Sequence, residues 1–408
     1  MQFPQQAVLL CGGLGKRLRP ITNLVPKPLA QLNGKPFLSY LFKQLSDQGI
    51  RKILLLAGYK SDLIEKFVQS FDDQKLDIIL VKGSIDWETG KRIYEARNLI
   101  EDSFILLYGD NFAPFCLNSV FKKNIEMDTI ATLTLHKKRE GNIKIHNEHI
   151  ISKYDPTRNS EGLTHVEVGY MHIKKSRFLK HLNKNDSLST TIKKLADNKL
   201  LSYVENKSKY YSISDINRLK ITEKHLKTKK IILIDRDGTI NEKPEKMNYI
   251  KKWDEIVLID STLRAMKKLS QMNFEFILIS NQAGIGRSIL TRKEVNKVNN
   301  ELKSFLLKEG VNILDWYICP HHWEDNCECR KPKPGLLFKA SDDYDLCLAN
   351  TLFIGDDVRD VYAANYAGAK SAIIGPDFDK CDESKGLPSK SAYDLDDLID
   401  WINDIYSE

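Results

Sequence analysis

Short, fully apolar runs recur along this 408-residue chain, and longer amphipathic stretches separate them. The runs are Ala7–Leu10, Ile53–Ala57, Phe104–Leu107, Ile231–Ile234, Phe274–Ile279 and Leu352–Ile354. A strand that is apolar on both faces must be covered on both faces, and helices that alternate with such strands cover a parallel sheet in this way. The pattern therefore predicts an α/β protein with mainly parallel sheets.

The length of the chain predicts two domains, because single cores stop growing at roughly 250–300 residues. The segment HLKTKK, residues 225–230, is polar and basic, and a new apolar run begins directly after it. We therefore expect one domain at residues 1–226 and a second at residues 227–408.

Several classes of protein are disfavoured by composition. No stretch approaches the roughly 18 apolar residues of a membrane span, and the N-terminus lacks the basic region of a signal peptide. An odd number of scattered cysteines, seven, is typical of reduced thiols. The net charge of +7 fits a lysine-rich solvated surface or an attraction for anionic substrates, and no run of five basic residues indicates a nucleic-acid tail. We expect a cytoplasmic protein with no membrane or nucleic-acid partner, and leave homo-oligomers open.

Polar clusters directly follow the apolar runs. The clusters are CGGLGKR from Cys11, GDN from Gly109, DRDGT from Asp235, SNQAGIGR from Ser280 and GDDVRD from Gly355. In open parallel sheets, ligands bind at the carboxyl ends of the strands. This repeated placement predicts a site in each half of the chain.

The first cluster has the residue types that bind a polyphosphate. Gly12, Gly13 and Gly15 allow backbone N–H groups to approach phosphate oxygens. Arg17 and Lys27 can neutralise charge on an α-phosphate and on leaving pyrophosphate. The alternative interpretation of the glycines alone is a tight turn.

The whole run Cys11–Leu29, continued by Asn33-Gly34-Lys35-Pro36, resembles the sugar-1-phosphate nucleotidyltransferases. The resemblance implies a Rossmann-like domain that joins a sugar 1-phosphate to a nucleoside monophosphate and releases pyrophosphate. It also implies that Asp110 holds Mg²⁺ and that Gly141 and Gly169 line the sugar site.

One position departs from this family. Ser212 stands where the family has a second metal-binding aspartate. Either Asp215 substitutes, or Asp110 and the substrate phosphates hold the metal alone. A third hypothesis is that the domain is an inactive nucleotide sensor or scaffold.

DRDGT, with Ser280, Lys331 and GDD in the same order, resembles the haloacid-dehalogenase-type phosphatases. The resemblance implies that Asp235 is the nucleophile, that Asp237 is the acid and base, and that both bind Mg²⁺ with Asp356, for which Asp357 is the second candidate. Ser280 and Asn281 would bind the phosphoryl group, and Lys331 would neutralise its charge. About 45 residues separate Asp235 from Ser280, which leaves no room there for a large cap.

A compact metal loop takes the place of that cap. Three thiols and one imidazole can form a closed tetrahedral zinc site, which is structural rather than catalytic. The ligands would be Cys319, Cys327, Cys329 and either His321 or His322, with the spacing favouring His321. The alternatives are a redox pair or buried thiols. The loop leads into Arg330 and Lys331, so the metal would fix these cations, with Arg330 a candidate substrate contact.

With this loop, the second domain resembles the D,D-heptose 1,7-bisphosphate and histidinol phosphatases. The two resemblances together predict a bifunctional enzyme that dephosphorylates a heptose bisphosphate at C7 and couples the heptose 1-phosphate to an NTP, expected to be GTP, for a bacterial surface polysaccharide. The rival hypotheses are a histidinol-phosphate phosphatase, another sugar or base, and a polynucleotide 3′-phosphatase with a basic groove.

Overall fold

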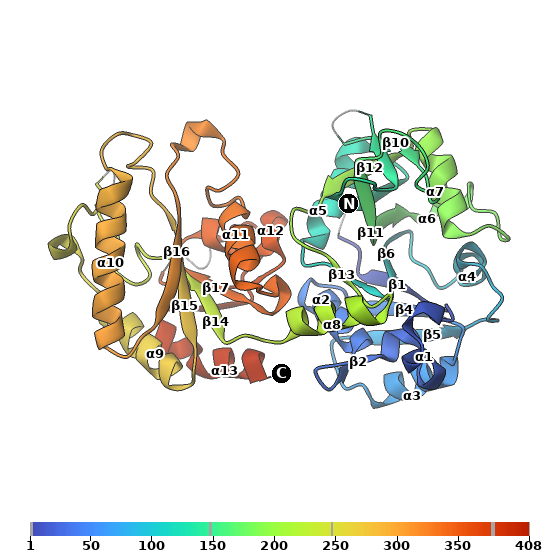
Figure 1. Ribbon diagram of the computed structural model, residues 1–408, viewed down its shortest axis with the longest axis horizontal. Helices are drawn as coiled ribbons and strands as arrows, with labels where there is room; N and C mark the ends of the chain where they lie inside the picture. The colour runs from blue at the N-terminus through green and yellow to red at the C-terminus, as the bar shows by residue number, and fades with distance from the viewer. Residues whose placement is uncertain (1–2, 147–148, 246–247, 377–379, 408) are drawn as a thin grey trace. The chain divides into compact units, whose positions relative to one another are not determined.

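The computed structural model describes residues 3–146, 149–245, 248–376 and 380–407. It divides into two compact units, Met1–Leu226 and Lys227–Glu408. Each unit has its own central sheet with helices around it (Figure 1), which confirms the predicted α/β class.

Among the described residues, the main sheet of the first unit has nine strands. Seven follow the order β10 (Ile151–Tyr154), β9 (Ile143–Ile145), β11 (His165–Lys174), β6 (Ser103–Tyr108), β1 (Gln6–Cys11), β4 (Lys52–Ala57) and β5 (Asp77–Lys82), and β8 (Ala131–Lys137) joins β11 to β12 (Leu201–Glu205). Strands β6, β1, β4 and β5 are parallel, so their carboxyl ends lie along one edge.

The other half of this sheet differs from the expectation of mainly parallel strands. Strand β11 is antiparallel to β6, β8 and β9, and β10 is antiparallel to β9. No helix lies between Lys137 and His165 in the described residues of that segment. Short connections join antiparallel neighbours, whereas parallel neighbours need a long crossover.

Helices and short strands complete the first unit. They are α1 (Ile21–Leu24), α2 (Phe37–Asp47), α3 (Ser61–Ser70), α4 (Thr89–Glu95), α5 (Leu117–Met127), α6 (Lys175–Leu179), α7 (Leu188–Asp197), α8 (Ile216–Leu226), β2 (Gln31–Leu32), β3 (Lys35–Pro36), β7 (Asn111–Phe112) and β13 (Tyr211–Ser212).

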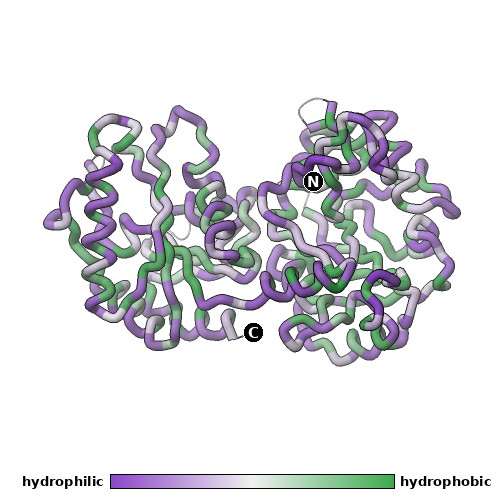
Figure 2. Tube along the Cα trace, viewed as in Figure 1, coloured by the Kyte–Doolittle hydropathy of each residue, from purple (hydrophilic) through white to green (hydrophobic). Residues whose placement is uncertain are grey.

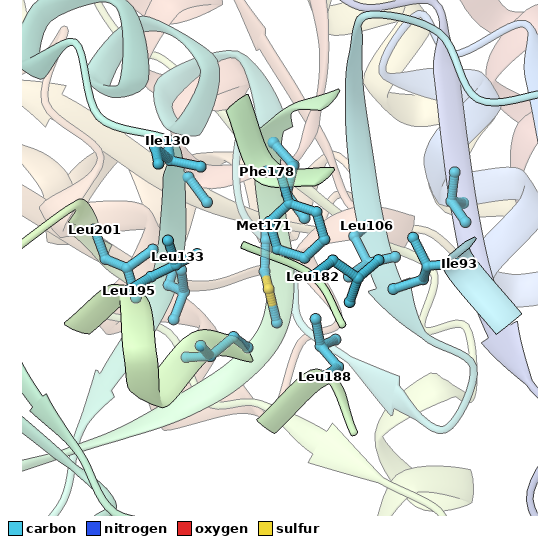
Figure 3. Close-up of a cluster of buried hydrophobic side chains, with 14 of the residues drawn as sticks. Ile93, Leu106, Ile130, Leu133, Met171, Phe178, Leu182, Leu188, Leu195 and Leu201 are labelled. Carbon is cyan, nitrogen blue, oxygen red and sulfur yellow. The ribbon is translucent and has the colours of Figure 1, made fainter. Parts of the chain in front are cut away.

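One face of the sheet packs against α7, where Leu188 and Leu195 meet Leu133 and Met171 (Figure 3). Each such buried side chain contributes roughly 1.5–3 kcal/mol.

The sheet of the second unit is parallel throughout its described strands. Its order is β16 (Ile313–Cys319), β15 (Glu275–Asn281), β14 (Ile231–Ile234), β17 (Leu352–Gly355), β18 (Lys370–Ile374) and β19 (Lys390–Ala392). The helices are α9 (Asp260–Gln271), α10 (Arg292–Lys308), α11 (Gly335–Tyr344), α12 (Val358–Ala367) and α13 (Ile399–Ser407). In both units the strands of the central sheet coincide with hydrophobic stretches of the chain (Figure 2).

Strand β14 shows why the apolar runs are continuous. Ile232 and Ile234 belong to one core cluster, with side chains of α9 and α13. Ile231 and Leu233 belong to a second cluster, with side chains of α11 and α12. Successive side chains of a strand point to opposite faces, so a sheet covered on both faces requires apolar residues at every position.

Candidate active sites

The first pocket forms where strands β1 and β6 end side by side. Leu10 pairs with Tyr108, and the amide of Gly109 donates to the Leu10 carbonyl at 3.1 Å. The loop after β1 and Asp110 after β6 therefore line one cavity of about 690 Å³. The predicted site residues that line it are Gly12, Gly13, Gly15, Arg17, Lys27 and Asp110.

Basic side chains outnumber acidic ones by one in the lining of this pocket. The Lys27 ammonium forms an ion pair with the Asp110 carboxylate, and both side chains keep some exposure, 14% and 30%. Arg17, in the short 3₁₀ turn Lys16–Leu18, is exposed nearby. The lining has four basic side chains, including Lys16 and Arg92, and three acidic ones, including Asp86 and Glu88. Cations at the phosphate-binding loop fit a polyphosphate, which carries negative charge.

The three predicted glycines have different local reasons. A Cβ at Gly13 would meet nothing within 4 Å, so this position is open to a ligand. Gly15 has a φ of +61° and lies against Thr22, so the turn requires it. A Cβ at Gly12 would overlap the buried guanidinium of Arg92, so packing inside the protein also explains that glycine.

Gly141 and Gly169 do not line this cavity. A Cβ at Gly141 would lie 1.8 Å from the carbonyl oxygen of His165. Gly169 has a φ of +97° and lies against the side chains of Tyr108 and Asn111. Close backbone packing accounts for Gly141, and the positive φ with close side chains accounts for Gly169. Their predicted contact with a sugar stays a prediction.

Ser212, which stands in place of the family's second aspartate, lies next to Ile213, whose amide donates to the Asp110 carbonyl at 3.0 Å. It pairs with Asn111 between β13 and β7, and its hydroxyl accepts a hydrogen bond from Arg218 Nη1 at 3.3 Å. Asp215 lies at the start of α8, where its carboxylate accepts from the Arg218 amide at 2.9 Å. Ser214, not Asp215, lines the cavity. Among the described residues, Asp110 belongs to no group of three metal-ligating side chains.

The second pocket forms at the carboxyl edge of the second sheet. Ile234 on β14 pairs with Leu278 on β15 and with Ile354 on β17, so the residues that follow these strands converge. The cavity, of about 140 Å³, is much smaller than the first. The predicted site residues that line it are Asp235, Asp237, Ser280, Asn281, Arg330 and Lys331.

Lys331 is the buried cation of this pocket. Its side chain is 3% exposed, and its ammonium lies 3.0 Å from Asp235 Oδ1 and 2.6 Å from Asp360 Oδ1. Burial alone would lower the pKa of Lys331, but the two carboxylates outweigh it and raise that pKa. Asn281 holds the Lys331 backbone at both its amide and its carbonyl, at 3.1 and 3.2 Å. Lys331 is therefore charged and fixed beside Asp235.

Burial raises the pKa of Asp235 to about 7, and the neighbouring carboxylates of Asp360 and Asp356 add to the shift. Lys331 acts in the opposite direction by favouring the charged form. A bound cation would oppose the shift in the same way.

Asp237 has different hydrogen-bond partners from Asp235. Its oxygens accept hydrogen bonds from Arg236 at 2.9 and 3.0 Å, from Gln282 at 2.8 Å and from Asn241 at 3.1 Å. Burial raises the pKa of Asp237, but the charge and hydrogen bonds of Arg236 outweigh it, so the pKa is lowered. This environment favours the proton-accepting half of the predicted acid–base role.

The structure gathers Asp360, rather than the side chain of Asp237, with Asp235 and Asp356. Ligand oxygens of these three carboxylates lie within 4.8 Å of one another. One oxygen of Asp356 is buried without a hydrogen-bond partner among the described residues. Oxygen ligands of this kind fit Mg²⁺. Asp357, the second candidate, caps α12 and binds Arg359 at 2.6 and 2.8 Å instead.

The four predicted zinc ligands also come together, at the end of β16 and in the loop after it. The ligand atoms of Cys319, His321, Cys327 and Cys329 lie within 4.8 Å of one another. His321 Nδ1 is 3.2 Å from Cys329 Sγ, and the Cys319 and Cys327 sulfurs are 3.6 Å apart. His322 Nδ1 instead accepts from the Glu324 amide at 3.3 Å. The cluster fits a tetrahedral zinc ion with His321 as its nitrogen ligand.

Residues 6–145 match the family model described as Nucleotidyl transferase, and residues 230–385 match the model described as Polynucleotide kinase 3 phosphatase. The D-glycero-beta-D-manno-heptose-1,7-bisphosphate 7-phosphatase of Neisseria meningitidis serogroup A is 31% identical over 145 residues, which are 36% of this chain and 76% of that protein. The chain belongs to the heptose-bisphosphate phosphatase family. Its N-terminal unit is a nucleotidyltransferase domain, so both predicted enzyme classes are confirmed.

Further proteins are similar to one unit each. The corresponding phosphatase of Helicobacter pylori strain J99 is 31% identical over 176 residues, 43% of this chain and 98% of that protein. The solved D,D-heptose 1.7-bisphosphate phosphatase from B. bronchiseptica, complexed with magnesium and phosphate, has 28% identity and a TM-score of 0.40, covering 43% of this chain and 99% of that chain. HddC from Yersinia pseudotuberculosis has 22% identity and a TM-score of 0.47, covering 54% and 99%.

Several residues of this heptose-bisphosphate phosphatase homologue were missed by sequence reasoning. Arg236, 2% exposed, fixes Asp237, and Gln282 joins Asp237 to Ser280 with bonds of 2.8 and 2.9 Å. Tyr249 and Trp323 also line the pocket. Arg236 and Gln282 adjoin recognised motif residues, which was the available signal, whereas no local pattern marks the two aromatic residues.

The described residues of the fusion contain no helix that is both long and apolar enough to cross a membrane.

Proposed function

We propose that this chain is a bifunctional enzyme of nucleotide-activated heptose synthesis. Its C-terminal domain removes the C7 phosphate of D-glycero-D-manno-heptose 1,7-bisphosphate, and its N-terminal domain couples the resulting sugar 1-phosphate to an NTP. The main support is the match of the C-terminal unit, at 31% identity, to phosphatases named for that substrate. A fused nucleotidyltransferase would use the product, because a phosphate left at C1 is its nucleophile.

In the phosphatase domain, the carboxylate of Asp235 attacks the distal phosphorus and forms an aspartyl-phosphate, while the bond from phosphorus to the sugar oxygen breaks. Lys331, 3.0 Å from Asp235, balances the charge that builds on the phosphoryl oxygens. Asp237 gives a proton to the leaving sugar oxygen, and the resulting Asp237 carboxylate then takes a proton from the water that hydrolyses the aspartyl-phosphate. Asp235 and Asp356, with Asp360 nearby, would hold a Mg²⁺ ion, whose charge favours attack of one anion on another.

Arg330 is our candidate for holding the far end of the sugar. It lines the pocket, and its Nη1 is buried without a hydrogen-bond partner among the described residues. A guanidinium can bind either sugar hydroxyls or the anomeric phosphate bidentately. A zinc ion held by the cluster would fix this position, because Cys329 directly precedes Arg330 in the sequence.

In the transferase domain, an oxygen of the sugar 1-phosphate attacks the α-phosphorus of the NTP, and pyrophosphate leaves. Arg17 and Lys27 are placed to balance charge on the α-phosphate and on pyrophosphate. Asp110 would hold Mg²⁺ together with the substrate phosphates, since Asp215 lies outside the cavity. We propose GTP because the stretch Val25–Leu41 resembles the guanylyltransferases, and a cytoplasmic enzyme because NTPs are cytoplasmic substrates.

The test is phosphorus NMR of the full chain acting on heptose 1,7-bisphosphate without nucleotide. We expect the C7 resonance to convert to free phosphate while the C1 resonance persists. Each of the four NTPs is then added separately, and pyrophosphate should appear fastest with GTP. Loss of the C1 phosphate first would contradict the pathway, because it would destroy the transferase's substrate.

Two parallel substrates address the rival hypotheses. Faster turnover of histidinol phosphate, or of an oligonucleotide with a 3′-phosphate, would replace the heptose proposal. If nucleotide binds but no sugar 1-phosphate ever gives pyrophosphate, the first domain is a sensor or scaffold.

A further inference from the structure

A buried guanidinium lies beneath the N-terminal pocket. Arg92, on helix α4, is 4% exposed and lines the cavity with Arg17, Lys27 and Asp110. Its Nη1 donates to the Ala57 carbonyl at 2.7 Å, and its Nη2 donates to the Ser84 carbonyl at 2.7 Å and contacts the Gly12 carbonyl at 3.5 Å. The side chain therefore joins the segments that follow strands β1, β4 and β5.

Three glycines leave the space that this guanidinium fills. Gly12, Gly58 and Gly83 each directly follow the last residue of β1, β4 and β5. A Cβ would lie 2.3 Å from Arg92 Cζ at Gly12 and 2.5 Å from Nη2 at Gly58. At Gly83 it would meet the Trp87 ring first, at 2.5 Å, and Arg92 Nη1 at 3.2 Å. These three glycines and one arginine thus form a single packed unit.

The charge of Arg92 has no carboxylate in direct contact, although Glu88, at the N-cap of the same helix, acts on it from further away and raises its pKa. Among the residues that the structure describes, no carboxylate lies within 4.0 Å of its nitrogen atoms. Burial lowers the pKa of Arg92, but a guanidinium remains charged near neutral pH. The neighbouring Cys11 thiol is neutral there, because burial raises its pKa to about 12. A buried charge without a counterion in direct contact is costly, and carbonyl dipoles offset only part of that cost.

We propose that Arg92 is a positioning residue that supplies the fixed counter-charge for the triphosphate of the bound nucleotide. The triphosphate would be a closer and more highly charged counterion than Glu88, which forms no ion pair with Arg92 among the described residues. The same guanidinium holds the backbone of Gly12, from which the phosphate-binding loop begins. This inference rests on the proposed nucleotidyltransferase function, and it adds a residue to that site.

Two substitutions separate the charge from the hydrogen bonds. Arg92→Lys keeps the charge but loses the planar fork, whereas Arg92→Gln keeps N–H donors for the carbonyls but loses the charge. Calorimetric binding of inorganic tripolyphosphate to the full chain measures the contribution without any base or sugar. We expect Arg92→Gln to weaken tripolyphosphate binding by tenfold or more, and Arg92→Lys to weaken it clearly less. Binding of GMP, with one phosphate, should change less than binding of tripolyphosphate.

The matched control is Arg97→Gln, which removes the same charge five residues further on. Arg97 is half-buried against Tyr94 and does not line the cavity. Arg97→Gln should leave tripolyphosphate binding unchanged. Phosphate release from heptose 1,7-bisphosphate by each variant reports that the second unit remains folded.

The outcomes distinguish this inference from the proposed function. Two results would contradict the inference but leave the proposed function standing. The unmodified chain could bind tripolyphosphate and Arg92→Gln bind it equally well, or Arg92→Lys could bind it more weakly than Arg92→Gln. In either case Arg92 has only a structural role. If the unmodified chain binds neither tripolyphosphate nor any NTP, the proposed transferase function fails and the inference fails with it.

Discussion

The two pockets of this chain differ in how their charged side chains are arranged. The N-terminal pocket measures about 690 Å³, and its basic side chains outnumber the acidic ones, with Lys16, Arg17, Lys27 and Arg92 against Asp86, Glu88 and Asp110. The C-terminal pocket measures about 140 Å³ and has equal numbers, with Lys243, Arg330, Lys331 and Arg359 against Asp235, Asp237, Asp357 and Asp360. The first pocket fits a ligand that brings several negative charges and its own leaving group. The second provides a nucleophile, and the carboxylates of Asp235, Asp356 and Asp360 are grouped closely enough to hold an added cation.

Both pockets nevertheless occupy the same place in their folds. Each lies at the carboxyl ends of parallel strands, β1 and β6 in one unit and β14, β15 and β17 in the other. The comparison shows that parallel topology selects where a phosphate site forms, whereas the residues after each strand select its chemistry.

The sharpest test of the comparison is to remove one carboxylate from each pocket. We expect Asp235→Asn to lower phosphate release on the order of 10³-fold or more, as loss of a nucleophile does in other enzymes, while pyrophosphate release from a sugar 1-phosphate and GTP is kept. Asp110→Ala should have the reverse effect. Separate assays of phosphate and pyrophosphate on each purified variant provide the measurement. Unchanged phosphatase turnover in Asp235→Asn would show that the assigned nucleophile is wrong.

Loss of a zinc ligand should affect only the activity of the C-terminal pocket. One zinc per chain should copurify, and Cys327→Ser should lower both zinc content and phosphatase activity, the latter by about 10–100-fold, because Arg330 and Lys331 lose their support. Metal analysis by mass spectrometry, together with both activity assays, measures this effect. Cys381→Ser, outside the cluster, is the control and should leave zinc bound. Fully active protein without zinc would contradict the prediction.

A buried carboxylate of the first unit should affect stability rather than either activity. Burial raises the pKa of Glu167 to about 8, above the unfolded value, so the folded state retains a proton that the unfolded state loses. Wild-type stability should therefore fall as pH rises from about 4.5 to about 8. Glu167→Gln should stabilise the first unit at pH 8 relative to pH 5 by on the order of 3 kcal/mol. Denaturant unfolding of both proteins at the two pH values measures this. If the two proteins differed in unfolding free energy by the same amount at pH 5 and pH 8, Glu167 would be ionised in the folded state and the prediction would be wrong.

The sequence was sufficient for features that depend on local order. Runs such as Ile231–Ile234 predicted strands buried on both faces, because every position in them is apolar. The placement of Asp110 and Asp235 after such runs predicted two pockets at strand ends. The spacing of Cys319, Cys327 and Cys329 predicted one cluster, because residues so near one another in the sequence can meet within a single loop.

Other features depend on which distant side chains meet, and only the tertiary structure decided them. Arg92 reaches glycines from three different strands, so the reason for Gly12 lies 80 positions away in the sequence. Asp360 joins the carboxylate group because α12 begins at the pocket, while Arg236 holds the side chain of Asp237 in other contacts. A sequence determines which strands form and which residues stand at their ends, because those properties are local. The pairing of buried charges is determined by packing across the sheet, where the cost of an unpaired charge selects one arrangement.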